Sequence, residues 1–457
     1  MTATRTATVE FSGARPATET ITWGQRAIWT AIERISPNEA YFNFVKTLPL
    51  ADTDVDTVLA AIGRVIGRHE ALHTRIVVVA GEPVQEVAAC GELTVDVIEA
   101  GDADVSELAA ETGDRYAEIA FDYAHDWPLR IAVLTHEGAP AMLVSCFCHM
   151  ATDFGGSMLV LADIEALVAG RELEPNTATQ PVDLARYQGS PAGRRVAKAA
   201  ARYWENAYER IPASMFDREI EEPEEHRFHR AFLMSRGLAK ASELVGERLG
   251  TGSSAVLNAA FAVTIGAITQ HDTCALLTIT KNRFLPQTRD MVSTLALEGL
   301  LVVGLADLSD FDEAVRATWR AGMAAYRYAQ YDELDRDRIV AAASERRGEL
   351  IHPFCCLNDL RDDMATGIPY ADTPLAELAP QSQIQWAPPL DMVDCRFCLH
   401  IADTPFGTAV RVTCDSAYVP RRYVLAFLKS VDSLVISAAD GPVPLADLPE
   451  PLALVNN

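Results

Sequence analysis

The sequence contains no long hydrophobic run. No stretch reaches the roughly 18–20 apolar residues of a membrane helix, and the opening MTATRTATVEFSGARP has no signal-peptide core. Basic residues are also scarce, since 39 lysines and arginines accompany 64 aspartates and glutamates, giving a net charge of −25. Such a surface repels nucleic-acid phosphates and anionic lipids. We therefore expect a cytoplasmic protein that binds neither nucleic acid nor membrane.

A disulfide or metal framework is also missing. The nine cysteines are an odd number at irregular spacing, which is typical of reduced thiols in a reducing compartment. The segment CRFCLH at 395–400 is one residue too long for a haem-attachment motif, and no second CxxC completes a zinc site. On a β-strand, Cys398 and His400 would share one face and Cys395 would point to the other. We predict a plain strand here and no metal site.

The length of 457 residues indicates two domains, because single hydrophobic cores rarely grow beyond ~250–300 residues. Helical and strand patterns alternate through both halves. Between 171 and about 197, proline, glycine, asparagine and charged residues interrupt these patterns, which indicates a linker. We predict an N-terminal subdomain at residues 1–178 and a C-terminal subdomain at 179–457, both of mixed α/β (α+β) structure.

A histidine ends a predicted buried strand in VSCFCHMATDFGGSML at 144–159, and a predicted helix follows. An imidazole is well suited to moving a proton near neutral pH. Asp153 could orient the His149 ring, or it could pair with an arginine and hold the loop. No serine or cysteine stands at a nucleophile elbow, which favours direct transfer between two bound substrates. A histidine at a strand end can equally be a structural hydrogen-bonding residue, so the motif alone leaves both interpretations open.

Five blocks in order resemble the condensation-domain superfamily of nonribosomal peptide synthetases, which shares its fold with chloramphenicol acetyltransferase. They are ITWGQRAIW (21–29), VIGRHEALHTRIV (65–77), AFDYAHDWPLRIAVL (120–134), CHMATDFGGSM (148–158) and TKNRFLPQTRDMVSTLAL (280–297). The likeness spans about residues 20 to 437. It implies two chloramphenicol acetyltransferase-like subdomains in a V-shaped pseudo-dimer with a tunnel between them.

The resemblance also implies roles for particular residues. His149 matches the catalytic histidine of the family motif, and Asp153 matches a structural aspartate whose arginine partner corresponds to Arg283. We expect a backbone N–H of Gly155 or Gly156 near the developing oxyanion.

Cys148 and Phe154 depart from the family pattern, and Ser157 lies close to the second departure. Cys148 replaces the first histidine of the family pair, and strand alternation predicts that it packs inward as a buried, protonated thiol. Phe154 either replaces the family glycine or marks an insertion, and the match of GGSM to the family's G-W-S-M favours the insertion. Gly156 and Ser157 would then begin the following helix, whose dipole suits negative charge. No HQxxPFE block is found, which fits a stand-alone or atypical member.

The function implied by the resemblance is acyl transfer in antibiotic and other natural-product biosynthesis. A peptidyl or acyl carrier protein would present an acyl or aminoacyl thioester on its phosphopantetheine arm, with no intrinsic cofactor, and an amine or alcohol would accept it. An acyl-CoA-dependent acyltransferase and a non-catalytic recruitment domain remain alternatives. Epimerisation is a weaker one, because Glu298 is more simply a solvated or rim acid. We place carrier docking at RYQGSPAGRRVAK (186–198).

Overall fold

The computed structural model describes residues 3–13, 15–217, 219, 224–361, 372–393 and 395–447. The chain divides into two compact units. Unit 1 comprises Met1–Lys198, Lys281–Leu297 and Gln330–Glu333, and unit 2 comprises Ala199–Thr280, Glu298–Ala329 and Leu334–Asn457. The segment 281–297 thus packs with unit 1 although unit 2 flanks it in the sequence. The subdomain boundary at 178/179 stays a prediction.

Unit 1 contains two sheets. The first has the order β1 (Ala3–Ser12), β6 (Cys90–Glu99), β7 (Leu129–His136), β8 (Ala139–Phe147), β3 (Phe44–Pro49), and only its β6–β7 pairing is parallel. The second is antiparallel and has the order β2 (Ala17–Thr20), β5 (Glu82–Val87), β4 (Thr74–Val79). The helices that begin in this unit are α1 (Trp23–Ile35), α2 (Val55–Arg68), α3 (Val105–Ala117), α4 (Phe154–Val168), α5 (Pro181–Gly189), α6 (Pro191–Tyr208) and α9 (Pro286–Arg289).

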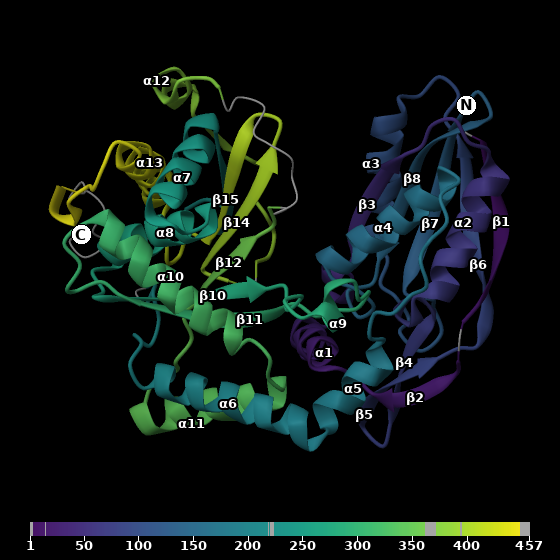
Figure 1. Ribbon diagram of the computed structural model, residues 1–457, viewed down its shortest axis with the longest axis horizontal. Helices are drawn as coiled ribbons and strands as arrows, with labels where there is room; N and C mark the ends of the chain where they lie inside the picture. Colours follow the sequence, from purple (N-terminus) through teal and green to yellow (C-terminus); the bar gives the residue numbers. More distant parts are fainter. Residues whose placement is uncertain are drawn as a thin grey trace. The chain divides into compact units, whose positions relative to one another are not determined.

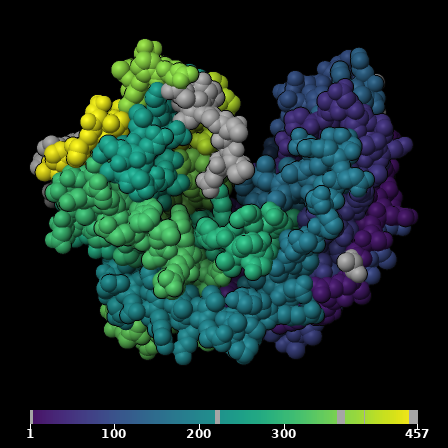
Figure 2. All heavy atoms as spheres, in the orientation of Figure 1, coloured from purple at the N-terminus to yellow at the C-terminus, as the bar shows by residue number. Residues whose placement is uncertain are grey.

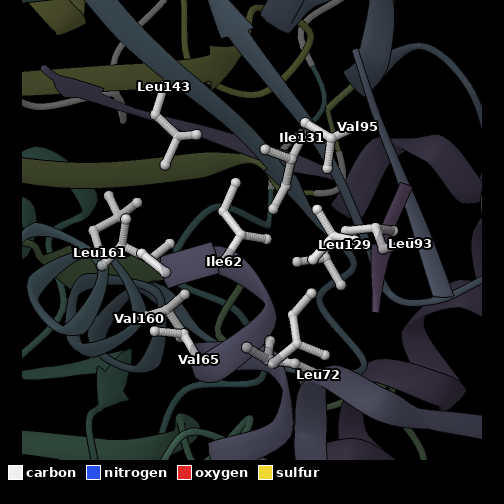
Figure 3. Close-up of a cluster of buried hydrophobic side chains, with 14 of the residues drawn as sticks. Ile62, Val65, Leu72, Leu93, Val95, Leu129, Ile131, Leu143, Val160 and Leu161 are labelled. Carbon is white, nitrogen blue, oxygen red and sulfur yellow. The ribbon is translucent and has the colours of Figure 1, made fainter. Parts of the chain in front are cut away.

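Helix α2 shows how the sequence builds this unit. The Asp54 carboxylate accepts the Thr57 N–H at 2.8 Å and caps the helix. Apolar residues at helical spacing then form one buried stripe, which packs with α4 and the inner face of the five-stranded sheet. Figure 3 shows this cluster, including Ile62, Val65, Leu143, Val160 and Leu161. A second cluster on the other face of β8 contains Cys146 and Cys148.

Unit 2 is built on one seven-stranded sheet. Its order is β11 (Leu297–Gly304), β10 (Thr273–Thr280), β12 (Cys355–Asp359), β14 (Phe397–Thr404), β15 (Gly407–Asp415), β9 (Phe228–Ser235), β13 (Gln383–Trp386). The helices are α7 (Arg236–Leu249), α8 (Ser253–Thr269), α10 (Phe311–Arg327), α11 (Glu333–Arg347), α12 (Leu375–Leu378) and α13 (Arg421–Ala438). Strand β12 runs parallel to both β10 and β14.

Helices α7, α8 and α13 lie on one side of strands β12, β14 and β15 (Figure 1). Phe427 of α13 contacts Phe397 of β14 edge-on at 5.0 Å and stacks on Phe261 of α8 at 5.8 Å between ring centroids. The face of β14 that carries Phe397 is therefore the core face.

The segment CRFCLH forms a strand from Phe397 onward, as predicted. The expectation that Cys395 points to the opposite face from Cys398 is wrong. Cys395 precedes β14, so strand alternation does not constrain it, and its sulfur is joined to that of Cys398 in a disulfide.

Within the described residues, no single helix has the length and apolar composition needed to cross a membrane. Only the sharply bent pair Arg236–Leu249 and Ser253–Thr269 passes that test, on length and composition alone.

Candidate active site

The predicted histidine lies in the turn between β8 and α4. Strand β8 ends at Phe147, and the turn is fixed by hydrogen bonds from Cys148 N–H to the Pro128 carbonyl at 2.9 Å and from Ala151 N–H to the Cys148 carbonyl at 3.0 Å. Thr294 Oγ1 donates to the His149 carbonyl. The backbone of His149 is therefore held from both sides, by the sheet and by the segment 281–297.

The His149 side chain is half-buried against aromatic rings. Its ring centroid lies 5.5 Å from that of Phe44 and 6.4 Å from that of Phe42, both in edge-on contact. Nδ1 is buried and has no hydrogen-bond partner within the described residues. Burial penalises the imidazolium form and lowers the pKa of His149, an effect that the Asp153 charge only partly offsets. The ring is thus neutral near pH 7 and able to accept a proton.

Asp153 ties three segments together with a buried carboxylate. Oδ1 accepts the Gly156 N–H at 2.8 Å and Arg283 Nη2 at 2.5 Å, while Oδ2 accepts the N–H groups of Leu295 and Ala296 at 2.9 and 3.0 Å. The Asp153 and Arg283 side chains are 5% and 12% exposed. The structure therefore brings together the two residues that the resemblance paired, and their arrangement is that of a brace.

Arg283 organises the segment that follows it. Besides the Asp153 contact, Nη2 donates to the Ser293 carbonyl at 3.2 Å and Nη1 donates to the carbonyls of Met291 and Thr288. A guanidinium offers five donors in a fixed plane, so one side chain can hold several turns of a loop. The loop in turn supplies the Thr294 hydroxyl that bonds to His149.

The two glycines of the motif permit a close approach between α4 and this brace. A Cβ at Gly155 would lie 2.7 Å from Arg283 Nε, and a Cβ at Gly156 would lie 2.1 Å from Thr152 Oγ1. The Gly156 N–H is engaged by Asp153. Ser157 is buried, and its hydroxyl donates to the Phe154 carbonyl at 2.8 Å.

Helix α4 begins at Phe154, so the prediction that Gly156 and Ser157 begin this helix is wrong. The reason is the Asp153 carboxylate, which caps the helix by accepting the Gly156 N–H. Phe154 is consequently the first helical residue and remains 36% exposed.

Replacing Gly156 by alanine is expected to destabilise the protein by about 1–3 kcal/mol, because the new methyl group overlaps buried Thr152 and must displace it. The matched control is Gly189→Ala in α5, where a Cβ meets nothing within 4 Å and added helix propensity contributes up to ~1 kcal/mol. Chemical denaturation of both variants measures the difference. Equal stability of the two would contradict this packing.

The sequence alone did not predict that Lys46 and two phenylalanine rings lie beside His149 and its motif. Lys46 Nζ lies 3.7 Å from the centroid of the Phe154 ring, and burial lowers the pKa of Lys46. Phe44 and Lys46 share one face of β3, and only the alternation within FVKTLP signals this. Nothing in the sequence places that face beside the motif, because the pairing of β3 with β8 is a long-range contact.

The Cys148 thiol is buried, with 3% of the residue exposed, and burial raises its pKa to about 12. A thiol with that pKa stays protonated at neutral pH and is a poor nucleophile. Glu298, the acid considered for epimerisation, forms an ion pair with Arg336 within unit 2.

A cavity of about 390 Å³ lies within unit 1, close to the backbone of the motif. Its lining includes Trp23, Tyr187, Asn282, Thr294 and Leu295. Thr294 connects it to the site, because the same residue bonds to the His149 carbonyl. The volume falls within the ~300–1,000 Å³ range of small-molecule pockets.

The family model for the condensation domain matches residues 20–384. The chain therefore belongs to the condensation-domain family.

One curated relative is the isonitrile lipopeptide synthase of Mycobacterium tuberculosis (strain ATCC 25618 / H37Rv), which is 29% identical over 217 residues, or 43% of this chain and 8% of the relative. The chain spans at most 15% of the length of such relatives. Another is tyrocidine synthase 2 of Brevibacillus parabrevis, which is 22% identical over 344 residues, or 73% of this chain and 9% of the relative. A third is the probable non-canonical nonribosomal peptide synthetase CymA of Salinispora arenicola (strain CNS-205), which is 30% identical over 178 residues, or 38% of this chain and 2% of the relative. The resemblance to the condensation-domain superfamily is thus confirmed at the level of the family.

Two solved structures illustrate the fold. The condensation domain of the Monacolin K polyketide synthase MokA superposes with a TM-score of 0.72 at 16% identity, covering 94% of this chain and 99% of that one. The X-domain from teicoplanin biosynthesis, solved in complex with OxyB, gives 0.69 at 18% identity and covers 98% of each chain. The predicted α/β fold of two chloramphenicol acetyltransferase-like subdomains is confirmed. The V-shaped arrangement and the tunnel stay predictions.

Proposed function

We propose that this chain transfers an acyl or aminoacyl group from the phosphopantetheine arm of a peptidyl or acyl carrier protein to an amine or alcohol. The product is an amide or an ester, and the protein needs no cofactor of its own. Membership of the condensation-domain family supports condensation chemistry on carrier-bound substrates. The donor, the acceptor and the roles of individual residues are our proposal.

The observation that carries this proposal is the position of His149: its backbone carbonyl accepts a hydrogen bond from Thr294, a residue that also lines the cavity. Burial also lowers the pKa of the ring, which favours the neutral form that can act as a base. As the nucleophile attacks the thioester carbonyl carbon, the imidazole accepts the proton of the attacking N–H or O–H group. The carbonyl becomes an oxyanion, for which we propose the Gly155 N–H as a donor, since Asp153 engages the Gly156 N–H. Collapse then breaks the C–S bond, and the imidazolium returns the proton to the departing phosphopantetheine sulfur.

The direct test offers three donors separately, an acyl-carrier protein, an acyl-CoA and the free acid, each with a panel of amines and alcohols. We expect a product of the summed mass, less the thiol, only with the carrier-bound donor. Turnover of acyl-CoA at an equal or higher kcat/KM would favour the small-molecule acyltransferase instead. Absence of product with every carrier-bound acyl group tried, in wild-type protein, would contradict the proposal.

A recruitment domain is the second candidate function. The similarity to the X-domain that was solved with OxyB favours it, and so does Phe154, which follows the motif aspartate where the family has glycine. Recruitment predicts tight binding of a partner protein without turnover, and that binding would persist when His149 is replaced.

We place the carrier on the exposed start of α6, where Arg194 and Arg195 are both exposed. Atoms of the α6 segment lie at the surface along the lower edge of Figure 2. A local basic patch is needed because this chain carries a net charge of −25 and carrier proteins are usually acidic.

Charge reversal by Arg194→Glu with Arg195→Glu should raise KM for the acyl-carrier protein about tenfold and leave kcat unchanged, because rim charges act mainly on association. The control reverses exposed Arg5 and Arg64 of unit 1, which changes the net charge equally. If both double variants show the same KM, this docking surface is wrong.

A further inference from the structure

Three cysteine sulfurs gather at one end of two neighbouring strands in unit 2. Cys356 is the second residue of β12 and Cys398 the second residue of β14, and the two are register partners in the parallel pair. Cys395 stands just before β14. All three sulfurs lie within 4.8 Å of one another, with 2.7 Å between those of Cys356 and Cys398.

The cluster lies on the side of the sheet away from its helix-packed core. Leu357 and Phe397 are buried on the core face, and Phe397 packs against α13. Cys356 and Cys398 therefore point to the other face, because side chains alternate along a strand. Cys356 and Cys395 are both partly exposed, so solvent and ions can reach the sulfurs.

A further polar group occupies the same face. His400 follows Cys398 by two residues on β14, and its Nδ1 is buried without a hydrogen-bond partner in the described part of the chain. It lies outside the group of three sulfurs. An imidazole on the same face but outside the group of sulfurs suits an outer-shell role, in which such groups orient ligands or a bound water.

We propose that Cys356, Cys395 and Cys398, when reduced, bind one Zn²⁺ ion as thiolates, with solvent in the fourth position. Zinc takes thiolates at ~2.3 Å in tetrahedral geometry, which places the sulfurs about 3.8 Å apart. The three sulfurs lie within 4.8 Å of one another, and reduction breaks the bond between Cys395 and Cys398, so that side-chain rotation can bring the sulfurs to that spacing. This site is independent of the proposed acyl transfer.

The disulfide between Cys395 and Cys398 is the oxidised form of the same site. A cellular dithiol reduces it by two electrons and two protons, giving two protein thiols and the oxidised dithiol. Binding of Zn²⁺ to the three thiols then releases three protons. The oxidised form retains a single thiol in the cluster and therefore loses the ion.

The test uses Co²⁺ as a spectroscopic probe on the full chain, reduced with a phosphine and desalted without oxygen. We expect thiolate-to-cobalt charge-transfer absorption that saturates at one equivalent and is abolished by added Zn²⁺. Cys395→Ser and Cys356→Ser each remove a direct ligand. Because the loss of an outer-shell partner alone costs up to about 100-fold in metal affinity, each variant should weaken Zn²⁺ binding by more than about 100-fold. Cys90→Ser, at an exposed cysteine of unit 1, is the control and should bind as wild type.

A second measurement does not depend on how the variants fold. X-ray absorption of Zn²⁺-loaded wild-type protein should show three sulfur neighbours at ~2.3 Å. One sulfur or none, or cobalt absorption that Cys356→Ser leaves intact, would overturn the proposal. In the oxidised protein the disulfide leaves seven of the nine thiols titratable. That sample should show no thiolate-to-cobalt absorption.

Discussion

Replacing His149 by alanine is expected to lower kcat/KM for carrier-bound donor by about 10²–10⁴-fold, the usual contribution of a positioned general base. The side chain is half-buried and makes no hydrogen bond through Nδ1 in the described residues, so its loss leaves no partner stranded. The free energy of unfolding should therefore change by no more than about 1 kcal/mol. Steady-state kinetics with thermal unfolding measures both quantities.

His125→Ala is the matched control, because His125 is an exposed histidine that pairs with Asp122 on the surface. Its kcat/KM should equal that of wild type. If His149→Ala also retains wild-type turnover, the imidazole is not the base.

The pH profile of wild type provides a further check on this role. Burial lowers the pKa of His149, so the basic form persists below the ordinary value of ~6.5. The midpoint of the acid limb in the pH profile of kcat/KM should therefore lie below pH ~6.5. The sign for stability follows from the same shift: between the folded and unfolded pKa the unfolded chain binds more protons, so the contribution of neutral His149 is present above ~6.5 and is lost as pH falls.

Asp153→Ala is expected to cost about 3–5 kcal/mol of unfolding free energy, because it leaves the Arg283 guanidinium buried without its counter-charge. It also removes the acceptor for the N–H groups of Gly156, Leu295 and Ala296. For a unit of this size the loss corresponds to a fall in Tm of roughly 10 °C. Activity should fall as well, but only as the fold is lost.

Glu209→Ala is the control for this substitution. Glu209 pairs with Arg346 on the surface, where an ion pair contributes at most ~1 kcal/mol. A combined Asp153→Ala, Arg283→Leu variant should lose less than the sum of the two single losses, because the second change removes the stranded charge. A Tm for Asp153→Ala equal to that of wild type would contradict the bracing role.

The candidate site was predictable from the sequence where its signals are local. The strand before His149, the capping aspartate and the glycines that follow all lie within one short stretch, so spacing and residue type indicate them. The Asp153–Arg283 contact joins positions 130 residues apart, and only the family resemblance suggested it. No periodicity encodes such a partner.

Two other features depend on strand order and were missed for that reason. Lys46 reaches Phe154 only because β3 pairs with β8 at the edge of the first sheet. Cys356 meets Cys398 only because β12 and β14 are parallel neighbours in register, although 42 residues separate the two cysteines. Strand order is set by packing of whole elements, so reading each segment separately cannot reveal it.

The assignment of residues 281–297 to unit 1 has a consequence for biosynthesis and for engineering. A nascent chain that has emerged only to Lys198 carries Asp153 but not Arg283, so the motif loop lacks its anchor until much of the second unit has been translated. A chimera that exchanges the first 198 residues between homologues would join one parent's carboxylate to the other's guanidinium. A chimera should therefore exchange residues 281–297 together with residues 1–198.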